Sequence, residues 1–246
     1  ILSPSAFIFP KMSARANILP RIRANQKKSG LTGPTELAKA ADFIKAHPQG
    51  PRPNADWPDL IARFKEQAIA MASTVDEVSS LAAVPHALAR YLQQLNLPLR
   101  GVCWPVLSSL DWAGAGITME SRVTISDDQL GVTGSYCAIA DTGTLLLTTN
   151  PSSPNKTSLL PDTHVAIVNT SRIVVDMEDA WNLLRVELKE LPRACSFISG
   201  PSRTGDIEQT LVIGAHGPYR VHIILVDEPH DDLIDTGWWK HKKPLA

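Results

Sequence analysis

Alternation between strand-sized apolar runs and helix-type segments is the feature that most limits how this chain can fold. Helical patterns occur at residues 59–73, 85–95 and 176–191. The strand-sized runs lie at residues 74–78, 99–104, 122–125, 136–140, 144–148, 164–169, 194–199 and 220–227. Strands that alternate with helices favour an α/β fold, with a mostly parallel sheet flanked by helices on both faces.

The helical segments carry the signals expected of amphipathic helices. Leu60, Phe64 and Ala68 recur at helical spacing, so one face of the 59–73 segment should be buried. Pro85 stands at the first turn of the next helix, where a missing N–H costs nothing. Carboxylates crowd the start of the 176–191 segment, where they suit the positive end of the helix dipole.

Composition shifts divide the chain into five parts. Residues 1–11 are apolar and lack the basic leader of a secretory signal, so we expect an upstream extension of the reading frame or a cloning remnant. Residues 12–48 form an N-terminal helical segment, and the proline-rich residues 49–58 form a linker. Residues 59–228 make up the α/β domain. A tail follows at 229–246, where Trp238 and Trp239 stand beside lysines. Such a pair favours the cover of a hydrophobic surface or an oligomer contact over a partner-docking or nucleic-acid site.

Charge and hydropathy exclude two classes of partner. Lys and Arg number 24 and Asp and Glu number 25, which leaves a formal net charge of −1. Such a balance gives no electrostatic footprint for nucleic acid or for an anionic membrane surface. The longest apolar runs, near Leu145 and Ile223, are strand-sized, so no membrane span is expected.

The cysteines favour neither a cluster nor a disulfide framework. Cys103, Cys137 and Cys195 are far apart and form no CxxC pair, whereas iron–sulfur clusters and structural zinc sites need four clustered ligands. We expect buried free thiols in a reducing cytoplasm. The histidines His164 and His222 lie in apolar strands and are expected to be hydrogen-bonded core residues. Dinucleotide, P-loop and serine-hydrolase motifs are absent from the sequence, so we predict no bound cofactor and no metal.

The segment at residues 195–208 holds the densest cluster of chemically useful residues. An apolar run ends in Ser-Gly-Pro-Ser-Arg-Thr-Gly, and Asp206 then begins what we expect to be a helix. Gly200 permits unusual backbone angles, and Arg203 offers a planar fork of donors for carboxylate or phosphate. A loop that enters a helix N-terminus is suited to anions, because the first N–H groups lack partners. The alternative is a tight turn whose arginine caps or pairs locally.

Four further blocks accompany this loop, and their order along the chain is informative. They are Gly131-Val-Thr, Ala140-Asp-Thr-Gly-Thr, Ser158-Leu-Leu-Pro and, after the loop, His216-Gly-Pro. In these blocks the chain resembles the lactate utilisation protein C family, the single-domain LUD proteins. The resemblance runs from about Ser13 to Asp227 and is densest from Gly131 onward.

This resemblance implies a fold similar to the ribose-phosphate isomerase and CoA-transferase superfamily. It also implies a cytoplasmic system that oxidises L-lactate to pyruvate, in which iron–sulfur partner proteins hold the redox centres. The chain would then be an accessory subunit without a redox centre of its own. The glutamate nucleophile and the carboxylate base of superfamily relatives have no counterpart that can be aligned here, so the resemblance supplies a pocket location and not a reaction.

In open α/β sheets, ligands usually bind beyond the carboxyl ends of the strands, where we expect three loops to converge. The catalytic candidates are His216, Asp206 and Glu208, with His216 the most plausible group for proton transfer. The alternatives are a hydrogen-bonded turn histidine for His216, a helix cap for Asp206, and a carboxylate that faces solvent or pairs with Arg203 for Glu208. The ligand-binding candidates are Asp141, Thr142, Gly143, Thr144, Ser199, Gly200, Ser202, Arg203, Thr204 and Gly205.

Two other functions remain open beside the accessory subunit. The protein could be a stand-alone enzyme of the isomerase, acyl-transferase or cyclo-ligase type that acts on a small phosphate- or carboxylate-bearing substrate. Alternatively, the motif blocks could be folding features only, and the role purely structural.

Overall fold

The computed structural model describes residues 13–26, 33–52, 56–188, 191–207 and 210–227. Residues 1–11, the 229–246 tail and Glu208 lie outside these ranges. The chain divides into two compact units, Ile1–Gly50 and Pro51–Ala246. The first unit holds helices α1 (Ala14–Asn25) and α2 (Pro34–Ala46), neither of which buries a residue. None of the described helices has the length and apolar character needed to cross a bilayer.

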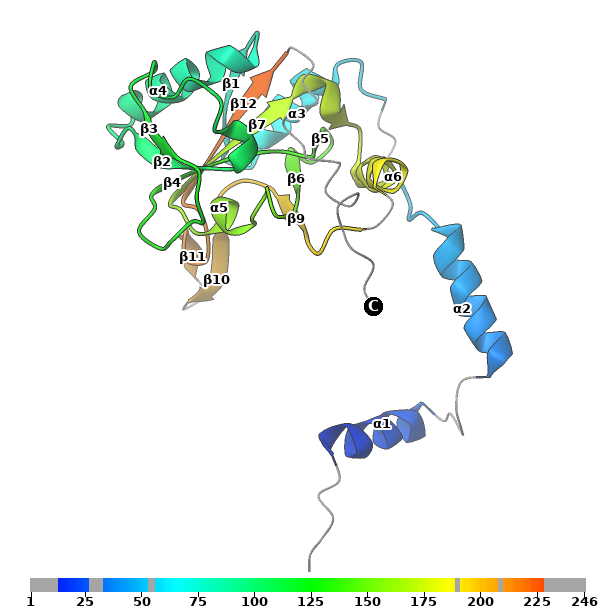
Figure 1. Cartoon of the computed structure of the whole chain (residues 1–246). Helices are drawn as coiled ribbons and strands as arrows, with labels where there is room; N and C mark the ends of the chain where they lie inside the picture. The colour runs from blue at the N-terminus through cyan, green and yellow to red at the C-terminus, as the bar shows by residue number, and fades with distance from the viewer. Residues whose placement is uncertain (1–12, 27–32, 53–55, 189–190, 208–209, 228–246) are drawn as a thin grey trace, which may run out of the picture. The chain divides into compact units, whose positions relative to one another are not determined.

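A parallel sheet of six strands forms the centre of the second unit (Figure 1). Every pairing in it is parallel, which confirms the expected α/β architecture. Two of the buried strands, at Thr163–Asn169 and Arg220–Val226, read as near-continuous apolar runs, as expected of strands covered on both faces. In spatial order the strands are β1 (Thr74–Val78), β12 (Arg220–Val226), β7 (Thr163–Asn169), β4 (Leu130–Gly134), β2 (Arg100–Cys103) and β3 (Thr118–Glu120).

Helices cover both faces of this sheet. Helix α4 (Val84–Gln94) buries Leu88 and Leu92, and its Tyr91 ring stacks on His222 of β12 at a centroid distance of 3.8 Å. Helix α5 (Lys156–Leu159) instead packs beside Gly131 of β4, which is aligned with His164. Because successive strand residues point to opposite faces, and Val221 is the register partner of His164, α4 and α5 cover opposite faces.

A second, four-stranded sheet continues directly from the first. Its order is β8 (Ile173–Val174), β5 (Cys137–Ile139), β6 (Thr144–Thr148) and β9 (Cys195–Ile198). Helix α6 (Met177–Glu187) packs on it and is capped by Asp176, whose carboxylate accepts from the Asp179 N–H. Arg172 pairs with Glu187 and also donates to the Tyr136 carbonyl, so an ion pair ties α6 to this sheet. Helix α3 (Leu60–Ala70), which precedes β1, buries Phe64 and Ala68 as the sequence predicts.

Two of the predicted elements are wrong. Residues 122–125 form no strand: Val123 and Ile125 are exposed, and Asp128 accepts hydrogen bonds from Arg122 and from the Ile125 N–H, which makes a turn. The helix expected from Asp206 is a β-hairpin of β10 (Arg203–Ile207) and β11 (Thr210–Ile213), which projects from the body in Figure 1. The β-branched residues at 210–213 favour a strand over a helix.

Two buried histidines lie on opposite faces of the main sheet. His164 shares a hydrogen bond of 2.8 Å with Thr133, and His222 shares one of 2.8 Å with Thr74. Each imidazole has a second nitrogen with no hydrogen-bond partner in the described part of the chain. Burial lowers the pKa of His164 to about 3 and that of His222 to about 4, the latter opposed by the Asp76 carboxylate.

These histidines should make the fold sensitive to acid. An unfolded histidine has a pKa near 6.5. Between about pH 6.5 and 4, these two histidines are therefore protonated in the unfolded chain but largely neutral in the folded chain. The free energy of unfolding should therefore fall as the pH drops through this range, by up to about 1.4 kcal/mol per pH unit for each histidine. Urea unfolding at a series of pH values measures this slope.

The variant His222→Phe tests the assignment, because phenylalanine keeps a ring against Tyr91 and removes the titration. We expect a shallower pH slope in His222→Phe, whatever its absolute stability. The exposed His86 provides the matched control, and His86→Phe should keep the slope of the wild type. An unchanged slope in His222→Phe would show that other groups cause the acid sensitivity.

Candidate functional site

The turn that contains Asp141, Thr142, Gly143 and Thr144 joins β5 to β6 and packs on helix α3. Gly143 has a φ of +63°, and a Cβ there would lie 2.3 Å from the Ala68 nitrogen, so only glycine fits. The hydroxyls of Thr142 and Thr144 are hydrogen-bonded to each other at 2.7 Å. The turn is therefore held by its backbone contact with α3 and by a hydrogen bond within the turn.

The loop that contains Gly200 and Arg203 packs on the end of the same helix. Gly200 has a φ of +72°, and a Cβ there would lie 2.0 Å from the carbonyl oxygen of Met71, the residue that caps α3. The guanidinium of Arg203 donates to that same oxygen at 2.9 Å. A cation at a helix C-terminus meets the negative end of the dipole, so this contact stabilises α3.

The structure joins the Arg203 loop to the His216-Gly-Pro turn. The Ser202 N–H donates to the Pro218 carbonyl at 2.9 Å, and the Gly214 N–H donates to the Ser202 carbonyl at 2.9 Å. A Cβ on Gly217 would lie 3.1 Å from the Ser202 Cβ. Two successive blocks of the family pattern thus form one local unit, with Ser199 exposed at its start and the exposed His216 beside it.

The location and setting expected for this unit are wrong in two respects. His216 directly precedes β12, so it lies at the amino edge of the parallel sheet and not beyond the carboxyl ends. The segment after Arg203 is a strand, so no helix N-terminus is available there for an anion. Asp206 belongs to β10 and caps no helix, and Thr204 and Gly205 also lie in that strand. The anion chemistry of the loop therefore depends on Arg203 and not on helical N–H groups.

Arg63 of α3 connects the β5–β6 turn to the start of the domain. Its guanidinium lies 4.1 Å from the centroid of the Trp57 ring and 3.9 Å from the Asp141 carboxylate. It also pairs with Glu66 at 2.9 Å. These contacts hold Asp141 against α3, so its carboxylate is part of an ion-pair network. This pairing could not be predicted from the sequence, because Arg63 stands among the polar residues of the helical pattern at 59–73.

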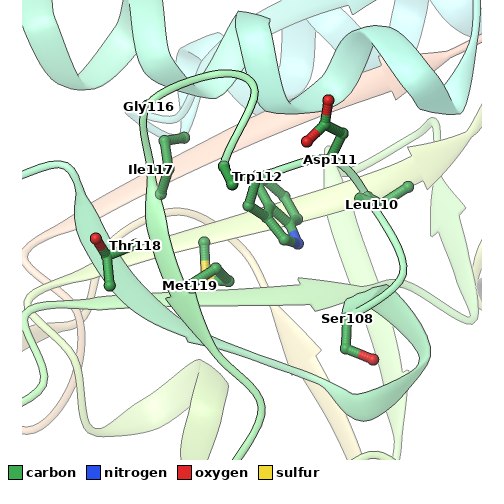
Figure 2. A pocket seen from close by; sticks show the side chains of 9 residues that line it. Ser108, Leu110, Asp111, Trp112, Gly116, Ile117, Thr118 and Met119 are labelled. Carbon is green, nitrogen blue, oxygen red and sulfur yellow. The ribbon is translucent and has the colours of Figure 1, made fainter.

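A cavity of about 580 Å³ has no residue of the motif blocks in its lining. Figure 2 shows that its labelled side chains come from the loop between β2 and β3 and from β3 itself. Asp111 is the one charged residue in this lining, and its carboxylate accepts from the Gly114 N–H at 2.8 Å. Trp112 is buried and donates to the Leu107 carbonyl. This cavity offers a ligand little charge and no acid–base pair.

A smaller cavity, of about 240 Å³, lies at the amino edge of the main sheet. Arg100 and Arg220, the first residues of β2 and β12, both line it. Sequence analysis missed both arginines as functional candidates. The one feature of the sequence that marked them was their position at the start of an apolar strand, and charged residues are common at strand ends.

The three thiols are free, and the described residues include no group of three or more His, Cys, Asp or Glu side chains placed to hold a metal ion. Burial raises the pKa of Cys103 to about 11 and that of Cys137 to about 12. Burial also raises the pKa of Cys195. Since the thiolate is the form that ligates metals and attacks substrates, a raised thiol pKa makes these cysteines poor metal ligands and poor nucleophiles.

A family model described as the LUD domain matches residues 61–226, which include all of the blocks above. The chain belongs to the LUD domain family. An uncharacterized protein of Neisseria meningitidis serogroup B is 37% identical over 239 residues, which cover 91% of this chain and 98% of that protein. A crystal structure of a DUF162 family protein from Deinococcus radiodurans matches with a TM-score of 0.53. That match covers 72% of this chain and 99% of the other at 23% identity, and it supports the fold alone.

Other relatives of this LUD protein carry functional names. Lactate utilization protein C 1 of Bacillus mycoides is 40% identical over 102 residues, 40% of this chain and 44% of that protein. Lactate utilization protein C of Bacillus subtilis is 33% identical over 129 residues, 51% of this chain and 54% of that protein. The chain therefore matches about half the length of these two relatives.

The close approach at Gly200 gives a direct test of what the motif loop does. Gly200→Ala would force a left-handed backbone and a clash with the Met71 carbonyl, and should cost about 2 kcal/mol or more of stability. Chemical denaturation measures this loss. Gly205→Ala is the matched control, because a Cβ there meets nothing within 4 Å, and it should change stability by less than about 0.5 kcal/mol. Equal stability of the two variants would contradict the packing of this loop on α3.

Proposed function

We propose that this LUD protein takes part in the use of L-lactate, as an accessory subunit of a system that oxidises L-lactate to pyruvate. The observation that carries the proposal is its similarity to proteins named lactate utilization protein C. The LUD-domain match over residues 61–226 also includes the glycines and the arginine that pack on α3.

We infer that the redox centres belong to iron–sulfur partner proteins. Oxidation of lactate releases two electrons, which a protein must pass to an acceptor. The thiols of this chain are dispersed, and burial keeps those of Cys103 and Cys137 protonated, so they are poorly suited to ligating a cluster. A role beside a subunit that carries the cluster is consistent with such a chain.

The Arg203 loop is proposed as an anion-binding surface within that system. Arg203 is exposed, and a guanidinium carries five N–H donors. One of its nitrogens donates to the Met71 carbonyl. Ser202 and the neighbouring His216 supply further polar groups beside it. The anion would be a carboxylate of a small molecule or of a partner's acidic side chain. His216 remains the candidate for proton transfer, with Asp206 and Glu208 as the carboxylate candidates.

Genetics in the native host tests the proposal. Removal of the gene should abolish anaerobic lactate-dependent dye reduction and growth on L-lactate while leaving growth on pyruvate intact. The wild-type protein should restore both activities and co-purify with iron-containing proteins. Arg203→Ala should restore them poorly, because the loop loses its charge.

Arg193→Ala is the control, since Arg193 is exposed and lies outside the loop. It should restore growth fully. A melting temperature for each variant separates loss of the fold from loss of function. Normal growth of the deletion strain on L-lactate would refute the proposal, and a purified protein that elutes alone and turns over a small anion would favour the stand-alone enzyme instead.

A further inference from the structure

The cavity of about 580 Å³ in Figure 2 lies along the outermost strand of the main sheet. Within the described chain, β3 is last in the strand order and pairs with β2 alone. The Thr118 N–H donates to the Leu99 carbonyl, on the β2 side of the strand. Since successive residues of a strand direct their N–H and C=O groups to alternate sides, those of Met119 face the outer edge. This edge can therefore accept one further strand.

The lining of this cavity suits an apolar side chain with a cation beside it. Its volume is within the range of pockets that hold a ligand, and Leu110, Ile117 and Met119 supply apolar surface. Asp111 is the one charged residue in the lining, and no cation of the described residues pairs with it. The Gly114 N–H donates to its carboxylate at 2.8 Å and so holds the charge in place. An occupant with aromatic and positively charged side chains would complement both features.

The sequence that follows the last described residue, Asp227, has this composition. Residues 238–243 are Trp-Trp-Lys-His-Lys-Lys, which combine two large aromatic rings with three lysines and no carboxylate. In an extended chain alternate residues lie on the same side, so Trp238 and Lys240 would share one side. A tryptophan of this segment can therefore enter the cavity while the lysine two residues later pairs with Asp111.

The tail is long enough to reach the cavity of its own chain. Strands β7, β4 and β2 lie between β12 and β3, so β12 and β3 are separated by four strand spacings, or about 19 Å. Residues 228–237 can span up to about 33 Å when extended. Because β12 and β2 are parallel strands of one sheet, the tail and the loop that lines the cavity both leave the sheet at its carboxyl edge. A second copy of the chain is thus not needed to fill the cavity.

We propose that residues 228–246 dock on the α/β domain of the same chain as a seventh strand beside β3, with Trp238 in the cavity and Lys240 on Asp111. Docking buries an aromatic ring, and it covers an edge strand that could otherwise pair with other chains. The site does not involve the Arg203 loop, and it stands or falls independently of the role in lactate use.

Amide hydrogen exchange of the full chain, followed residue by residue by NMR, tests this docking. The Met119 N–H has no hydrogen-bond partner within the described chain, so it should be protected only if the tail covers it. We expect protection in the wild type and exchange at least about tenfold faster in the double variant Trp238→Ala/Trp239→Ala, because the tail loses its aromatic anchor. Asp111→Asn should speed the exchange about threefold, since an exposed ion pair contributes little.

Two matched controls should leave the exchange of Met119 unchanged. Phe43→Ala removes an exposed aromatic ring of α2, and Asp127→Asn removes an exposed carboxylate that does not line this cavity. A melting temperature for each variant separates unfolding from loss of docking. Fast exchange of Met119 in the wild type, or the same slow exchange in the folded double variant, would overturn the proposal. Protection that is lost on dilution would also overturn it, because the tail would then come from a second copy.

Discussion

Close backbone contacts that leave no room for a Cβ hold the α/β domain together. Gly131 of β4 faces the Thr157 carbonyl near α5, where a Cβ would lie at 2.0 Å. Gly143 and Gly200 make equally close approaches to the backbone of α3 at Ala68 and Met71. Helix α3 leads directly into β1 of the main sheet, whereas Gly143 and Gly200 adjoin strands of the second sheet. The helix therefore fixes the position of one sheet relative to the other.

This constraint explains what the motif blocks encode. Three of them, Gly131-Val-Thr, Asp141-Thr-Gly-Thr and Ser199-Gly-Pro-Ser-Arg, contain a glycine at such a contact. Arg203 adds a charge that complements the end of α3. A sequence pattern that identifies the family can thus reflect packing as much as chemistry. It follows that the loop can keep its shape in relatives whose ligands differ, and that function must be argued from exposed groups such as Arg203 and His216.

The sequence predicted the fold well wherever a strand or helix was long and apolar. Strands β1 and β6 have the predicted bounds, and α3 begins one residue after its predicted start at Asp59, which caps it. The candidate site was predicted less well from the sequence. The segment after Arg203 contains Gly and Asp, which resemble a helix start, but its partner strand at 210–213 is β-branched and the pairing between them prevails. Strand β4 was not predicted at all, because Gly131 and Gly134 are poor strand formers. In the structure, packing against neighbouring elements accommodates them.

The edge at which a ligand meets the sheet also follows from how the two sheets are connected. Parallel sheets usually bind ligands beyond their carboxyl ends. Here β4 continues within three residues into β5, and β7 continues through Thr170–Arg172 into β8, so protein fills the space beyond these two central strands. Ser135 and Asn169, at the carboxyl ends of β4 and β7, are accordingly buried. In the described chain the four-stranded sheet does not extend along the amino edge, and a cavity there is lined by Arg100, Arg220, Gln129 and Asp162. Because the chain continues beyond the carboxyl edge, the amino edge is the one where the central strands border a cavity.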